Sequence, residues 1–238
     1  MSEVAPRATR RIGHKGADLI APGNTLASFD AGLAAGVDMI EFDVLPEHVD
    51  GTGRLLLAHD HAEAARRAPL ELEAGLAHFA SDAYAGIELN VDLKLPGYEE
   101  RVIAALRAHG LAERTLVSSM EVGSLATFRA AAPEIRLGWS VPRVRRNYLA
   151  HPATRPLALA AIAYARRALP PRLTAAIREG RVEAVMAHWC LVTPAFWAAI
   201  RDAGGELYVW TVDDDARIAT LEAIGVTGII SNDPRLFA

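Results

Sequence analysis

The sequence predicts an α/β fold, a single (β/α)8 TIM barrel that spans residues 1–238. One α/β barrel commonly has about 250 residues, close to the 238 found here. Half of the residues (51%) are hydrophobic, which is enough for a large core. Strand-like runs alternate with helical stretches, and eight parallel strands close naturally into a barrel. An open doubly wound sheet is the main competitor, but no Gly-rich nucleotide turn follows the first strand.

The predicted strands are short apolar or alternating runs. In chain order they are RRIGH from Arg10, MIEFDV from Met39, IELNVDLK from Ile87, TLVSSM from Thr115, IRLGWSV from Ile135, AVMAHW from Ala184, LYVWTV from Leu207 and GIIS from Gly228. After the second strand, VDGTGRLLLAH (49–59) predicts a short hairpin with its turn at Asp50-Gly51.

Helical patterns separate these strands. They cover residues 24–36, 98–110, 124–133, 193–204 and 214–225, and several begin at Thr, Ser or Asp and end at Gly, as capping requires. Residues 142–180 form the longest connection, which we expect to be helical and to cover the barrel mouth. Within it, Arg143–Arg146 predicts a solvated basic loop.

Composition limits the class of function. The formal net charge is −4, which argues against a nucleic-acid partner. Cys190 is the single cysteine, so there is no disulfide framework or thiolate cluster, and we expect a small buried hydrophobe. The N-terminus has no apolar signal region and no run approaches ~18 apolar residues, so we expect a soluble cytoplasmic protein. The oligomeric state is left open.

Two carboxylates stand inside an apolar run in the second strand. Glu41 and Asp43 are two positions apart, so they share one face of the strand. A half-exposed edge strand with a solvated face would account for them. Half of a metal site is the alternative, because paired anions are costly to desolvate unless a cation lies between them.

Other polar residues favour the metal site, because functional groups of a barrel lie where its strands end. Asp92 completes a set of oxygen ligands that suits Mg²⁺ or Ca²⁺. His14 and His59 are candidate proton donor and acceptor, since imidazole titrates near neutrality. Lys15 and Lys94 supply positive charge for an anion. Together these residues indicate phosphoryl transfer.

The same motifs resemble those of the glycerophosphodiester phosphodiesterase family. GHKGADLIAPGNT and the following strand MIEFDV, then GRLLLAHD, are similar to the family's HRG, PENT, E-x-D and HD signatures. Later, NVDLK, VWTVD and GIISNDP resemble its N-x-E-x-K, WTVN and TD-x-P motifs. The resemblance runs in order from Arg11 to Pro234.

The resemblance implies a metal-dependent barrel that hydrolyses glycerophosphodiesters to sn-glycerol 3-phosphate and an alcohol. It implies that His14 and His59 are the acid and base, that Glu41, Asp43 and Asp92 bind the metal, and that Lys15, Asn24, Lys94 and Trp210 contact substrate. Trp210 is equally well explained as an aromatic that fills the barrel. Asn24 has two compatible roles, one as the cap of the following helix and one as a residue that points into the site.

The chain departs from the family pattern on the substrate side. Gly23 replaces the glutamate of PENT, Lys15 replaces an arginine and so loses its bidentate fork, and Asp92 is one methylene shorter than the usual glutamate. Asp213 stands for an asparagine and Asn232 for an aspartate. The insertion between Asp60 and Ile87 is reduced.

Two rival functions remain open. A degenerate barrel that binds a phosphodiester without cleaving it is compatible with Gly23 and the reduced insertion. A lysophospholipase D-like enzyme at a membrane surface would draw on Arg143–Arg146 and on the apolar run LALAAIAYA (157–165). We expect simple hydrolysis of a small, soluble phosphodiester, with membrane contact only in that last alternative.

Overall fold

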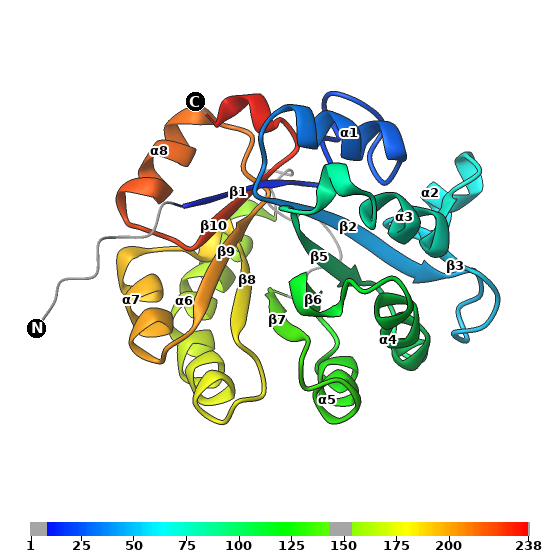
Figure 1. The fold of residues 1–238 in the computed structure, drawn as a ribbon. Coiled ribbons are helices and arrows are strands. Elements are labelled where there is room, and N and C mark those ends of the chain that lie inside the picture. The colour runs from blue at the N-terminus through cyan, green and yellow to red at the C-terminus, as the bar shows by residue number, and fades with distance from the viewer. Residues whose placement is uncertain (1–8, 143–153, 238) are drawn as a thin grey trace, which may run out of the picture.

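Eight parallel strands close into a barrel in the computed structural model, which describes residues 9–142 and 154–237 (Figure 1). The barrel closes because β1 pairs in parallel with both β2 and β10. In order around the barrel the strands are β1 (Arg10–Gly13), β2 (Met39–Pro46), β5 (Glu88–Leu93), β6 (Thr115–Ser119), β7 (Arg136–Val141), β8 (Ala184–His188), β9 (Glu206–Trp210) and β10 (Gly228–Ser231). The predicted fold class is confirmed.

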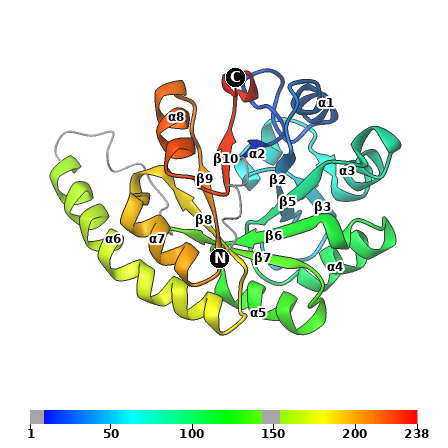
Figure 2. The ribbon, with the colours of Figure 1, turned by 60° about the vertical axis from the view of Figure 1, so that its left-hand side comes forward.

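Helices surround the barrel (Figures 1 and 2). The α-helices are α1 (Leu26–Ala34), α2 (His61–Arg66), α3 (Leu72–Phe79), α4 (Glu99–Ala108), α5 (Val122–Ala131), α6 (Arg155–Arg178), α7 (Pro194–Asp202) and α8 (Asp215–Ala223). Short 3-10 turns are η1 (Asp82–Tyr84), η2 (Ala112–Arg114), η3 (Trp189–Leu191) and η4 (Pro234–Leu236). None of the helices in the described ranges is long and apolar enough to cross a membrane.

The hairpin after β2 differs from the prediction. Its first strand is the end of β2, where Leu45 and Pro46 pair with β3 (Leu55–Leu57), and not the segment from Val49, whose side chain is exposed. A third short strand, β4 (Leu70–Glu71), continues this antiparallel extension. The reduced insertion therefore contains α2, β4 and α3, none of which the sequence pattern predicted.

The expected helix in the long connection is α6, which lies in the outer layer beside α7 (Figure 2). Its C-terminal part packs on the barrel through Leu173, Ala176 and Ile177. Arg143–Arg146 lie outside the described residues. Cys190 is buried, as expected.

Alternation along the strands creates two hydrophobic layers. Outward-facing residues such as Phe42 pack against the helices, where its ring stacks on Phe79 at 5.2 Å. Inward-facing residues fill the barrel, and this inner cluster contains Ile12, Met39, Leu116, Ala184, Met186, Tyr208 and Ile230. Burial of both faces explains why the strands read as nearly continuous apolar runs.

Charged residues close the barrel at the N-terminal ends of its strands. Arg10 of β1 pairs with Glu88 of β5 at 3.0 Å and donates to the Tyr208 hydroxyl at 2.7 Å. Arg136 of β7 contacts Glu88 and pairs with Glu206 of β9 at 3.2 Å. The network joins four strands at the face of a TIM barrel that serves stability.

We predict that Glu88→Ala destabilises the barrel, because it leaves two part-buried guanidinium groups without their shared carboxylate. Since these side chains are not fully buried, the loss should be about 2 kcal/mol, below the roughly 3–5 kcal/mol of a buried pair. Urea unfolding measures it. Glu179→Ala, which breaks the exposed pair with Arg181, is the control and should cost no more than about 1 kcal/mol. Equal losses in the two variants would contradict the assignment.

Candidate active site

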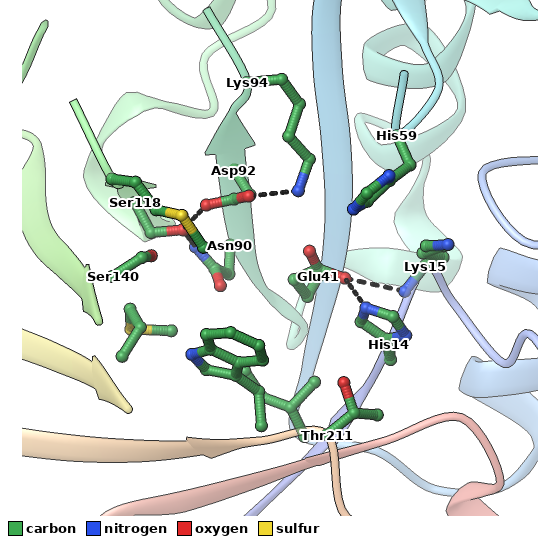
Figure 3. Close-up of a pocket in the computed structure, with 14 residues that line it drawn as sticks. His14, Lys15, Glu41, His59, Asn90, Asp92, Lys94, Ser118, Ser140 and Thr211 are labelled. Carbon is green, nitrogen blue, oxygen red and sulfur yellow. Dashed lines mark hydrogen bonds and ion pairs between the residues drawn. The ribbon is translucent and has the colours of Figure 1, made fainter. Parts of the chain in front are cut away.

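A cavity of about 190 Å³ opens at the carboxyl ends of the strands (Figure 3). Each strand delivers its side chains to this end of the barrel, so residues far apart in the chain meet. The lining residues are His14, Lys15, Glu41, His59, Asn90, Asp92, Lys94, Ser118, Met120, Ser140, Met186, Trp210, Thr211 and Ile230. No described residue of α6 is among them, so the cover expected from the connection after β7 is not found in that part of the chain.

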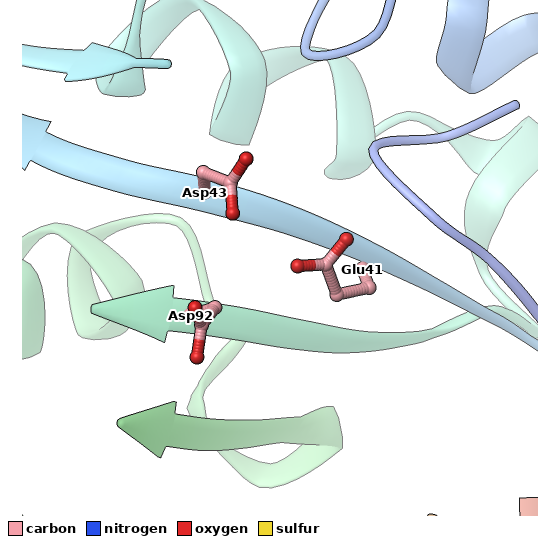
Figure 4. A group of neighbouring side chains, drawn as sticks. All are labelled: Glu41, Asp43 and Asp92. Atoms are coloured by element: carbon pink, nitrogen blue, oxygen red, sulfur yellow. The ribbon is translucent and has the colours of Figure 1, made fainter. Parts of the chain in front are cut away.

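Three carboxylates form the acidic cluster of Glu41, Asp43 and Asp92 (Figure 4). The parallel register of β2 and β5 sets Asp43 opposite Asp92. One oxygen from each residue lies within 4.8 Å of the others. This set of oxygen donors fits a hard divalent cation, and the shorter side chain of Asp92 still reaches the cluster.

Lys94 neutralises part of this negative charge. Its ammonium nitrogen contacts Asp92 and lies 2.5 Å from Asp43 Oδ1. Burial alone would lower the pKa of Lys94, but the surrounding carboxylates raise it well above the ordinary value. Lys94 therefore stays charged, and it lines the cavity next to the acidic cluster.

The two carboxylates of β2 respond differently to their surroundings. Burial raises the pKa of Glu41 well above its usual value, and the negative charge of Asp43 adds to the effect. Burial also opposes ionisation of Asp43, but the charges of Lys94 and the two histidines hold its pKa well below the usual range. The surroundings of Asp43 thus favour its anionic form, whereas those of Glu41 disfavour its ionisation.

Asn24 supports Asp43 from behind. Its amide nitrogen donates to Asp43 Oδ2 at 2.9 Å, and its carbonyl oxygen accepts from the Asp43 backbone N–H at 3.0 Å. Asn24 is buried and does not line the cavity, so in this geometry it holds a carboxylate and does not reach the space for substrate. The expected cap role is wrong, because Thr25 caps α1 through the Ser28 backbone N–H at 3.2 Å.

His14 is half-buried and directly follows β1. Its Nδ1 lies 2.5 Å from Asn232 Oδ1, and its Nε2 lies 3.9 Å from Glu41 Oε2. Burial lowers the pKa of His14, and Asp43 and Asn232 offset part of that effect. The tight turn that follows requires Gly13, since a Cβ there would lie 1.9 Å from the Gly16 carbonyl oxygen.

His59 lines the same cavity and comes from a different segment of the chain. It follows β3, and half of its side chain (53%) is exposed. Its Nδ1 lies 3.4 Å from Asp60 Oδ2, and Asp60 in turn caps α2. The structure therefore brings the two predicted imidazoles to one cavity beside Glu41 (Figure 3).

Asp18 lies next to two positions that depart from the family pattern, Lys15 and Gly23. Lys15 has a positive φ of 50°, donates its backbone N–H to Glu41 at 2.8 Å, and pairs through Nζ with Asp18 at 3.6 Å. A Cβ at Gly23 would lie 2.6 Å from Asp18 Oδ1. The Asp18 carboxylate thus fills the space that a larger residue at position 23 would need.

Trp210 lies between the cavity and the core of the barrel. It lines the cavity and also packs against the inner hydrophobic cluster of the barrel. His188 meets its ring edge-on at 5.1 Å.

Two serines that were not predicted as site residues, Ser118 and Ser140, line the cavity. Ser118 donates to Asp92 Oδ1 at 2.7 Å and accepts from Asn90 at 3.0 Å. Its alternation with Leu116 on β6 was the available signal, since that alternation places Ser118 on the inward face. Ser140 of β7 also lines the cavity.

The fold and this site define a class: a TIM-barrel enzyme with its polar groups at the carboxyl ends of the strands. A model of the "Glycerophosphoryl diester phosphodiesterase family" matches residues 70–236. The chain therefore belongs to the glycerophosphoryl diester phosphodiesterase family of enzymes. The matched range contains Asp92, Lys94 and Trp210 and begins after His59.

Individual relatives agree. A glycerophosphodiester phosphodiesterase from Caldanaerobacter subterraneus subsp. tengcongensis is 25% identical over 94% of this chain and 93% of its own. Two solved structures share the fold. One is a glycerophosphodiester phosphodiesterase from Agrobacterium tumefaciens (20% identity, TM-score 0.69, 96% of this chain and 97% of that one). The other is an Oleispira antarctica phosphodiesterase in complex with the product sn-glycerol-3-phosphate (21% identity, TM-score 0.68, 96% and 94%).

We predict that Asn24→Ala destabilises the protein, because the Asp43 carboxylate and backbone N–H both lose a buried partner. Each lost bond should cost about 1–3 kcal/mol. Alanine adds about 1–2 kcal/mol of strain at the positive φ of 57°. Asn24→Gly removes the amide without that strain and is the matched control. Chemical unfolding should rank wild type above Asn24→Gly and Asn24→Gly above Asn24→Ala. A wild-type stability for Asn24→Gly would contradict the support role.

Proposed function

We propose that this chain hydrolyses glycerophosphodiesters to sn-glycerol 3-phosphate and an alcohol in a metal-dependent reaction. The acidic cluster of Glu41, Asp43 and Asp92 carries this proposal, because it joins three oxygen donors in one place. These residues would hold Mg²⁺ or Ca²⁺, which when bound would offset the phosphate charge and polarise the phosphorus centre. The named product of the Oleispira antarctica relative supports the substrate class.

The remaining residues of the cavity would position and protonate the substrate. Lys15 and Lys94 border the cavity as cations and would bind the phosphate oxygens. Trp210 would form an apolar wall next to the substrate carbon atoms. Asn24 would keep Asp43 in place and not contact substrate itself.

His14 and His59 would transfer the protons. One imidazole takes the proton of the attacking oxygen as the P–O bond forms, and the other donates a proton to the alkoxide as the second P–O bond breaks. The attacking oxygen comes either from water or from the neighbouring hydroxyl of the glycerol. In the second case a cyclic phosphate forms first and is then opened by water.

The rival functions gain little from the structure. A non-catalytic barrel is disfavoured by the family and by the shared cavity of both histidines. Two features favoured a lysophospholipase D-like enzyme. The first, Arg143–Arg146, lies outside the described residues. The second is the apolar run 157–165, in which Leu157 and Tyr164 are exposed on α6 and do not border the cavity.

Chelation tests the metal dependence. We predict that purified enzyme releases sn-glycerol 3-phosphate from glycerophosphocholine, that EDTA abolishes the release, and that excess Mg²⁺ or Ca²⁺ restores it. A coupled glycerol-3-phosphate dehydrogenase assay measures the product. Full activity after exhaustive chelation would contradict the metal dependence, and no release with any metal would contradict the substrate class.

Histidine substitution tests the acid–base roles. We predict that His14→Ala and His59→Ala each lower kcat by about 10²–10⁴-fold, the usual contribution of one proton transfer. His109→Ala is the control, because His109 pairs with Glu73 outside the cavity, and it should keep wild-type kcat. Circular dichroism checks that all three variants fold. Near-wild-type kcat in either test variant would exclude that histidine.

A further inference from the structure

Three polar side chains lead away from the cavity through His14. His14 Nδ1 lies 2.5 Å from Asn232 Oδ1. Asn232 Nδ2 then donates to Asp213 Oδ2 at 2.7 Å, and the Asn232 backbone N–H donates to Asp213 Oδ1 at 2.8 Å. The hydroxyl of Ser231 donates to Asp213 Oδ1 at 3.0 Å and is the third donor to this carboxylate. The carboxylate of Asp213 is therefore held by groups from the end of β10.

This arrangement fixes the direction of the two hydrogen bonds that link Asp213 to Asn232 and Asn232 to His14. A carboxylate only accepts, so the Asn232 group that faces Asp213 has to be the NH₂. The amide oxygen of Asn232 then faces His14, and an amide oxygen also only accepts. The proton of the neutral imidazole must consequently sit on Nδ1. Nε2 is left with its lone pair, on the side of the ring that faces Glu41.

The sequence supports the view that Asp213 and Asn232 act as a pair. Both positions depart from the family motifs described above, and they depart in opposite senses. An amide and a carboxylate have exchanged places, so the pair still contains one residue of each kind. A change at only one of the two positions would leave two amides or two carboxylates facing each other.

We propose that Asp213 is a positioning residue that acts through Asn232 to hold His14 in the Nδ1–H tautomer, with the unprotonated Nε2 aimed into the cavity. Asp213 does not line the cavity. It orients the amide, and the amide orients the ring. The inference rests on the proposed role of His14 and deepens it, because an imidazole held in this tautomer starts the reaction as the proton acceptor. His59 then starts as the donor.

Reciprocal substitution separates this role from general stability. Asp213→Asn leaves two amides, so Asn232 loses the partner that sets its orientation. Asn232→Asp places two carboxylates together, which repel each other. The double variant Asp213→Asn/Asn232→Asp restores a complementary pair, in which the new carboxylate accepts from His14 Nδ1–H and from the new amide.

With the Mg²⁺-loaded enzyme and glycerophosphocholine, we expect each single variant to lower kcat about 10- to 100-fold, the usual cost of losing a supporting partner, with KM changed less than threefold. The double variant should recover to within about threefold of wild-type kcat. Asp215→Asn, an exposed carboxylate two positions away, is the control and should be unchanged. A double variant as impaired as the sum of the singles would overturn the pairing.

The ¹⁵N shifts of His14 give a readout that does not depend on turnover. In the Mg²⁺-loaded protein, with the resonances assigned by comparison with His14→Gln, wild type should show a protonated Nδ1 and a bare Nε2. Asp213→Asn should show a mixture of tautomers, and the double variant should return to the wild-type pattern. A wild-type ring protonated on Nε2 would refute the inference. Inactivity of all proteins towards glycerophosphocholine would refute the proposed substrate and leave this spectroscopic test in force.

Discussion

Mutual repulsion within the acidic cluster is the constraint on which the rest of the site depends. Glu41, Asp43 and Asp92 each bring an oxygen within 4.8 Å of the others, in a part of the barrel with little access to water. Lys94 contributes one positive charge against three carboxylates. Burial, together with the negative charges of Asp43 and Asp92, raises the pKa of Glu41. Two negative charges remain when all three carboxylates are ionised. A divalent cation would balance them without protonation of a ligand.

The fold meets this constraint with rigid elements. The register of β2 and β5 sets two of the carboxylates opposite each other. Behind them, Asn24 and Lys15 both adopt positive φ angles, of 57° and 50°, in the loop after β1. Such backbone costs about 1–2 kcal/mol at a non-glycine residue. Here it lets the Asn24 amide grip Asp43 and lets the Lys15 backbone N–H reach Glu41. The hydrogen bonds to Asp43 and Glu41 thus offset the backbone strain in the loop.

Much of this structure could be predicted from the sequence, because strong local patterns carry it. All eight barrel strands were predicted, since a strand buried on both faces reads as a continuous apolar run. Glu41 and Asp43 were identified because they interrupt such a run, and Asp92 because it lies near the end of an alternating strand. Their predicted roles as ligands, and those of the two histidines in catalysis, stay predictions until they are tested.

Other features depend on contacts between distant segments and leave little local signal. The helix α2 has six residues and none of them is buried, so it shows no amphipathic period. The helix α3 is also short, but its buried residues Leu72, Gly75, Leu76 and Phe79 recur at helical spacing, so its signal was present in the sequence and was missed. The occupation of space at Gly23 by Asp18 is a steric relation that no spacing rule contains. The link from Asp213 to His14 joins the ends of three strands. Both of its unusual residues were visible in the sequence as separate departures, but only the structure shows that they touch.

The most direct test of the account is anomalous X-ray diffraction at the manganese edge from crystals grown with Mn²⁺, which substitutes for Mg²⁺ at oxygen sites. We expect one strong peak at the carboxyl ends of β2 and β5, within about 2.0–2.6 Å of oxygens from Glu41, Asp43 and Asp92. If saturating Mn²⁺ gives no peak at those three carboxylates, or binds only elsewhere on the molecule, the proposed metal site is contradicted.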